Sequence, residues 1–176
     1  MTGRASMPPP AEMFPGYCVI LLVGLPGAGK STYCRQHRLP ALSSDALRQW
    51  ILDDAGAQDH PELIFGALRY LLRARLRAGR EQTYIDATNL TPHERAPLAA
   101  IAAEFRYPCG ALFFDVPLDV CERRNRLRTR EGGLEVPEAA LARLAAKLRP
   151  PARGEGFAAM ARVDADGATA PYVGLE

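Results

Sequence analysis

The sequence of 176 residues predicts an α/β fold in which a parallel sheet is flanked by helices. Three short runs rich in apolar, aromatic and β-branched residues, 17–23, 83–86 and 111–116, have the composition of buried strands. Segments with helical spacing of apolar residues separate them, and such alternation is typical of a parallel sheet. A glycine-rich loop follows the first run, at the end of a strand where these sheets bind ligands.

The predicted elements form one domain, residues 17–165, between a flexible leader at 1–16 and a weakly structured tail at 166–176. The leader contains three consecutive prolines and shows no periodicity. In order, the expected elements are a strand at 17–23, a helix at 31–37, a short strand at 41–43, helices at 45–52 and 61–78, a strand at 83–86, a helix from 92, a strand at 111–116, helices at 118–127 and 138–148, and an edge strand at 161–165.

Capping residues and helix breakers place the ends of the helices in the first half of the chain. Ser44 or Asp45 is the expected N-cap of the helix that ends near residue 52. Pro61 and Gly79 suit the beginning and end of the next helix, whose apolar residues hold one face. The several arginines of that helix fit either a solvated face or a surface for nucleic acid.

Similar signals place the helices of the second half. Thr91 and Glu94 have the spacing of a capping box for the helix that begins there. Pro117 ends the third strand, and the glycines in residues 130–133 break the helix that follows it, so that a mobile linker is expected there. Pro137 then opens the last helix.

The composition is that of an ordinary globular protein, with 48% hydrophobic residues and a net charge of +2. The longest apolar run, residues 17–23, is too short to span a membrane. The N-terminus lacks the order of a signal peptide, and the four cysteines form no C-x-x-C pair. These features predict a protein of the reducing cytoplasm with no membrane partner.

The loop at residues 24–32 has the spacing G-x-x-x-x-G-K-[ST] of a phosphate-binding loop. Its glycines allow successive backbone N–H groups to point at one anion. Lys30 is placed to reach the β- and γ-phosphates, and the Ser31 hydroxyl to bind Mg²⁺. The expected nucleotide-binding residues of the loop are Gly24, Gly27, Ala28, Gly29, Lys30, Ser31 and Thr32.

The residues beyond the loop favour a kinase among the proteins that use such loops. The chain contains no Asn-Lys-x-Asp guanine signature and no long apolar strand ending in Asp-Glu, which argues against a GTPase, a motor or a helicase. Asp45 follows the 41–43 strand, where a carboxylate can accept the proton of an acceptor hydroxyl. Arg48 lies one helical turn later, where it can hold an anionic part of the acceptor.

A second group of basic residues lies on the helix expected to begin at residue 118. Arg124 and Arg128 are four residues apart and share one helix face beside the glycine linker. They suit a helical lid, at about residues 124–137, that closes over ATP and stabilises charge on the transferred phosphoryl group. The alternative is an exposed basic helix end that interacts favourably with the helix dipole.

Together these motifs resemble the 5′-hydroxyl polynucleotide kinase family, a group of P-loop phosphotransferases. The resemblance extends from about residue 17 to residue 163. It rests on residues 24–32, Ser44-Asp45 with Arg48, residues 86–89, Arg124-Asn125-x-x-Arg128, residues 136–137 and residues 155–157.

The resemblance implies a P-loop kinase fold and transfer of the γ-phosphate of ATP, with Mg²⁺, to the 5′-OH end of DNA or RNA. Asp45 would be the general base, and the acceptor cleft would lie beside it. The residues implied for catalysis are Lys30, Asp45, Arg48 and Arg128. Those implied at the ATP phosphates are Lys30, Arg124 and Arg128. Those implied for the acceptor are Asp45, Arg48, Asp86, Thr88 and Asn89.

The acceptor is less specified than the phosphoryl transfer. The sequence is expected to be a kinase module without a phosphatase or ligase domain, and only Trp50, Tyr70 and Tyr84 are candidates for stacking on bases. A small-molecule kinase or a seryl-tRNA kinase of the same fold is one alternative. A nucleotide-dependent binding module without transfer is another. Either Asp86 or Asp115 could reach the Mg²⁺ shell, and Asp86 has the better context.

Overall fold

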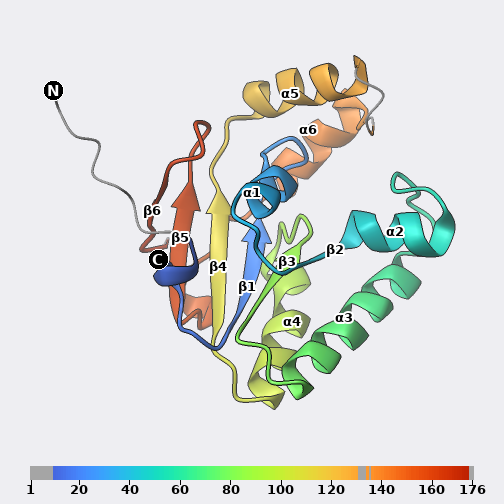
Figure 1. Ribbon diagram of the computed structural model, residues 1–176. Coiled ribbons are helices and arrows are strands. Elements are labelled where there is room, and N and C mark those ends of the chain that lie inside the picture. The colour runs from blue at the N-terminus through green and yellow to red at the C-terminus, as the bar shows by residue number, and fades with distance from the viewer. Residues whose placement is uncertain (1–9, 131–133, 135, 175–176) are drawn as a thin grey trace, which may run out of the picture.

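The computed structural model describes residues 10–130, 134 and 136–174, and its centre is a six-stranded sheet (Figure 1). The strands are β1 (Cys18–Val23), β2 (Ala41–Ser43), β3 (Gln82–Asp86), β4 (Cys109–Phe114), β5 (Ala159–Val163) and β6 (Thr169–Pro171). They lie in the order β2-β3-β1-β4-β5-β6; the first five are parallel and β6 is antiparallel to β5. The predicted α/β fold with a parallel sheet is confirmed.

Helices connect the parallel strands. They are α1 (Lys30–Gln36), α2 (Ser44–Leu52), α3 (Pro61–Arg77), α4 (Pro92–Glu104), α5 (Leu118–Arg130) and α6 (Glu138–Lys147), with short 3₁₀ turns at Pro10–Met13 and Arg153–Glu155. Figure 1 shows α1 and α5 near the carboxyl ends of β1 and β4. α5 is three residues longer than the predicted helix, so Arg128 lies within it.

Both faces of the sheet are covered. Along β1, Ile20 and Leu22 belong to a core shared with α1, α5 and α6, whereas Val19 and Leu21 belong to a core shared with α2, α3 and α4. All six residues of β1 are buried. This two-sided burial explains why β1 is a continuous apolar run rather than an alternating one.

The helix caps agree with the prediction at α4 and differ at α2. The N-cap of α2 is Ser43, whose hydroxyl accepts a hydrogen bond from the N–H of Ala46 at 3.4 Å. The predicted caps lie one and two residues later, inside the helix, because the last residue of β2 already has the extended backbone that a cap requires. Thr91 caps α4 as predicted, while the Glu94 carboxylate accepts from the N–H of the residue before the cap.

The ends of the domain are more ordered than predicted. Residues 169–171 of the predicted tail form β6, so β5 is not an edge strand. In the predicted leader, the Phe14 ring is buried against Gly110, where an added Cβ would lie 2.6 Å from the ring. The expected linker at 131–133 lies outside the described residues. No helix of the described chain is long and apolar enough to cross a membrane.

Candidate active site

The phosphate-binding loop leaves β1 at Val23 and enters α1 at Lys30. Gly27 and Gly29 have left-handed backbone conformations, with φ of 82° and 100°. A Cβ on Gly27 would lie 2.6 Å from the carbonyl oxygen of Cys121 in α5. The loop is therefore packed against the start of α5, and no side chain fits between them.

Lys30 lies buried within this loop. Its ammonium donates to the carbonyl oxygens of Gly24 and Leu25, at 2.8 Å each. Burial lowers the pKa of Lys30 to about 8, while the carboxylates of Asp86 and Asp45 raise it and Arg128 lowers it. The fold thus brings charged groups from β3, α2 and α5 into electrostatic range of the loop lysine.

Asp86 ends β3 directly beside the loop. Burial raises the pKa of its carboxyl group, and hydrogen bonds from Ser31 and Ser43 together with the charge of Lys30 offset part of that rise. Asp115, in contrast, is exposed and pairs with Arg162 at 3.3 Å. Of the two aspartates, Asp86 is therefore the one that contacts the serine expected to bind Mg²⁺.

Asp45 and Arg48 form an ion pair along one face of α2. The Arg48 Nη1 to Asp45 Oδ1 distance is 2.9 Å, and the Arg48 guanidinium lies 6.0 Å from the centre of the Phe65 ring. The Asp45 side chain is 55% exposed and that of Arg48 only 11%. In this structure Arg48 therefore holds the Asp45 carboxylate, which remains open to solvent, instead of presenting a free guanidinium to an acceptor.

Arg124 and Arg128 of α5 make different contacts. Arg124 donates to the carbonyl oxygens of Gly27 and Ala28, at 3.4 and 3.3 Å, and to that of Ala165. Arg128 donates from Nη2 to Oδ1 of Asn125 at 3.0 Å. Within the described part of the chain, the buried Nε of Arg128 has no hydrogen-bond partner. An unpaired donor near Lys30 suits a phosphate oxygen.

Thr88 and Asn89 contact the residues at the junction of β1 and the phosphate-binding loop. The side chain of Asn89 is buried, and its Nδ2 donates to the carbonyl oxygen of Leu22 at 2.7 Å. The Thr88 carbonyl accepts from the N–H of Gly24 at 3.1 Å. The Asn89 amide thus ties the segment after β3 to the end of β1, and the expected role of Thr88 and Asn89 beside the acceptor stays a prediction.

A buried ion pair that the sequence analysis missed supports this junction. The Arg95 side chain is 1% exposed and donates to both carboxylate oxygens of Glu155, at 2.7 and 2.6 Å. Its Nη1 also donates to the carbonyl oxygens of Asn89 and Arg149, at 2.9 and 3.0 Å. Because Arg95 and Glu155 are 60 residues apart, no local spacing signals the pair.

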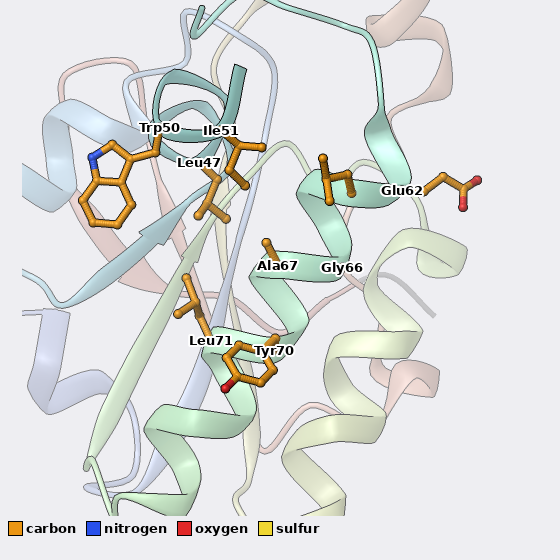
Figure 2. A pocket seen from close by; sticks show the side chains of 9 residues that line it. Leu47, Trp50, Ile51, Glu62, Gly66, Ala67, Tyr70 and Leu71 are labelled. Atoms are coloured by element: carbon orange, nitrogen blue, oxygen red, sulfur yellow. The ribbon is translucent and has the colours of Figure 1, made fainter. Parts of the chain in front are cut away.

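A separate hollow of about 460 Å³ lies between α2 and α3 (Figure 2). Trp50 and Tyr70, from the two helices, lie at its edge and are 85% and 72% exposed. The third stacking candidate, Tyr84, is fully buried and cannot reach a base. The hollow is lined by Leu47, Trp50, Ile51, Glu62, Leu63, Gly66, Ala67, Tyr70 and Leu71.

Residues 19–151 match a family model described as an AAA domain, AAA_33. The chain belongs to this family of P-loop kinase domains. The matched residues contain the phosphate-binding loop, most of β1, all of β2, β3 and β4, and α1 to α6, whereas β5 and β6 lie beyond them. A nucleotide-binding, kinase-like fold is therefore established for the chain.

Solved structures with the same fold include proteins of several activities. One is a chain of the Pnkp1/Rnl/Hen1 RNA repair complex, with a TM-score of 0.67 and 22% identity. The match covers 93% of the present chain and 50% of the chain in that complex. This chain thus spans half of that relative. Chaetomium thermophilum Kti12, solved with ADP-AlF3, gives a TM-score of 0.62 at 17% identity, over 83% of this chain and 88% of its own. A Sinorhizobium meliloti gluconokinase gives 0.56 at 22% identity, over 86% and 83%.

Proposed function

We propose that the protein is an ATP-dependent kinase that phosphorylates the 5′-OH end of a polynucleotide. The observation that carries the proposal is the convergence of Lys30, Asp45 and Arg128, from three separate elements, around one phosphate-binding loop. A solvent-open carboxylate beside a phosphate site is what phosphoryl transfer to a hydroxyl requires. The similarity to a chain of an RNA repair complex supports a polynucleotide acceptor.

The chain's own groups suit the steps of this reaction. Lys30 would exchange its bonds to the loop carbonyls for bonds to the ATP phosphates, and Nε of Arg128 would donate to a phosphate oxygen. The Ser31 hydroxyl, which contacts the Asp86 carboxylate, would hold Mg²⁺, and the ion would supply neutralisation of the phosphate charge. Asp45 would accept the proton of the acceptor hydroxyl. The hydroxyl oxygen would then bond to the γ-phosphorus while the bond from that phosphorus to ADP breaks.

The test is transfer of labelled γ-phosphate from ATP to a 5′-OH oligonucleotide. Asp45→Asn removes the proton acceptor but keeps the side-chain shape, so we expect kcat to fall about 10²–10⁴-fold with little change in ATP affinity. Lys30→Ala should weaken ATP binding as well. Asp53→Asn is the matched control, because Asp53 caps the other end of α2 in a left-handed conformation that asparagine tolerates.

The result also separates the competing functions. If the wild-type protein binds ATP but labels no oligonucleotide, the polynucleotide proposal fails, and nucleosides, tRNA and sugar acids become the acceptors to assay. A small-molecule kinase is the second candidate, since a gluconokinase shares the fold over most of both chains. An Asp45→Asn variant with unchanged function would instead support a nucleotide-dependent binding module.

We also infer a reducing, cytoplasmic environment. The four cysteines are free thiols buried in the two cores: Cys18, Cys34, Cys109 and Cys121. Burial raises the pKa of each thiol, which keeps it in the unreactive protonated form.

A further inference from the structure

Asn125 is a buried polar residue in the middle of α5, with 3% of its surface exposed. Its Nδ2 donates to the carbonyl oxygen of Val136 at 2.7 Å, and its Oδ1 accepts from the N–H of Val136 at 3.3 Å. The amide thus satisfies both backbone groups of one residue just before α6. The same Oδ1 accepts from Nη2 of Arg128, at 3.0 Å.

These contacts restrict an arginine that would otherwise be flexible. A free arginine side chain loses rotamer entropy when it is ordered, and binding then has to compensate for that loss. Asn125 lies three residues before Arg128 on the same helix face and fixes one edge of its guanidinium. The Nε edge remains buried and unpaired in the described structure, and the charge of Arg128 reaches Lys30.

We propose that Asn125 is a positioning residue that holds the Arg128 guanidinium ready for the phosphates of the nucleotide and ties it to the backbone at Val136. Asn125 itself touches no phosphate; it acts through Arg128. The inference rests on the proposed function, because it assumes that Arg128 contacts bound ATP.

A double-mutant cycle tests it. We expect Asn125→Ala to weaken the binding of Mg²⁺ and ATP about tenfold, the loss typical of one charge-assisted hydrogen bond. In an Arg128→Ala background the same change should have almost no effect, because the group that it positions is gone. Adenosine, which lacks phosphates, should bind all four proteins with similar affinity.

The matched control is Arg126→Ala. Arg126 forms an exposed ion pair with Glu138 at 2.7 Å, and this pair also joins α5 to α6, through groups other than Asn125 and Arg128. Arg126→Ala should leave ATP affinity near that of the wild type. Its small effect should be the same with or without Arg128.

The outcomes separate this inference from the proposed function. Equal losses of ATP affinity from Asn125→Ala in the two backgrounds, or a matching loss for adenosine, would overturn the positioning role. A wild-type protein that binds no ATP would overturn the proposed function, and the role of Asn125 together with it.

If Asn125→Ala does not fold, nuclear magnetic resonance of the wild-type protein gives the answer. The Arg128 Nε–H signal should shift on addition of Mg²⁺ and ATP, and the Asn125 side-chain amide protons should exchange slowly with water. An Arg128 Nε–H signal that does not shift on addition of the nucleotide would overturn the inference. So would rapid exchange of the Asn125 side-chain amide protons with water.

Discussion

At the scale of single residues, Lys30 shows how the loop prepares for an anion. Its ammonium is buried and bonded to two carbonyl oxygens, which replace the water it has lost. The two carbonyls carry only partial charge, so the cation is incompletely compensated. That imbalance explains why burial dominates and the pKa falls to about 8.

The lowered pKa predicts a pH dependence of ATP binding. Phosphates bind the protonated lysine, so affinity is greatest below the free-protein pKa of about 8 and falls as the pH rises through that value. Above it each binding event must take up a proton, which costs up to about tenfold in affinity per pH unit. Isothermal titration calorimetry between about pH 7 and pH 10 checks this slope.

Lys30→Arg is the control for this prediction, since arginine remains protonated throughout the range. Its ATP affinity should be lower than that of the wild type but flat with pH. A wild-type affinity that does not change across the same range would contradict the assignment of the titration to Lys30.

At the scale of elements, the Arg95–Glu155 pair connects α4 to the segment after α6 and to the end of β3. Arg95 holds the backbone carbonyls of Asn89 and Arg149. The Asn89 side chain in turn donates to Leu22, near the end of β1 where the phosphate-binding loop begins. Such a pair is costly to break, because the remaining partner stays buried without its counter-charge.

Arg95→Met tests this connection. We expect the free energy of unfolding, measured in urea, to fall by about 3–5 kcal/mol, because Glu155 loses a bidentate partner in a buried site. The control is Arg73→Ala, which breaks the exposed Arg73–Glu104 pair between α3 and α4 and should change the stability little. Equal effects of the two substitutions would show that burial of the first pair does not matter.

Local signals in the sequence were sufficient for most elements. Pro61 begins α3, and the apolar runs mark β1, β3 and β4, because propensity and burial favour the same structure there. α5 continues past its predicted end since no breaker occurs before residue 130. β6 has three residues and no periodicity, so its pairing with β5 has no local signal.

The site was predictable in part for a related reason. The loop motif and the spacing of Asp45, Arg124 and Arg128 indicated groups that the structure does bring around Lys30 or the loop backbone. A motif gives residue types but not the directions of side chains, and so the inward orientation of Asn89 was missed.

At the scale of the whole molecule, the two cores lie on opposite faces of the sheet. Tyr33 of α1 belongs to the core shared by α1, α5 and α6. Its hydroxyl lies 2.7 Å from Oγ1 of Thr169 in β6, in a buried contact. Its ring also meets Phe114 edge-on, with centres 5.4 Å apart. α1, which begins at Lys30 of the phosphate-binding loop, is thus in contact with β6.

Tyr33→Phe tests this contact with minimal change in packing. Loss of the hydroxyl leaves Thr169 without this partner, and we expect the protein to lose about 1 kcal/mol of stability in thermal or urea unfolding. Thr169→Val should lose a similar amount, and the double variant no more than either alone. Fully additive losses would mean that the two hydroxyls do not depend on each other.

The short outer strands of the sheet have a consequence for the protein at high concentration. β2 and β6, the two edge strands, have three residues each. β6 ends in Pro171, which has no backbone N–H to donate. A long, flat edge would be a template for strands of other copies and hence for aggregation. With both outer strands so short, the sheet gives a neighbouring copy little backbone to pair with.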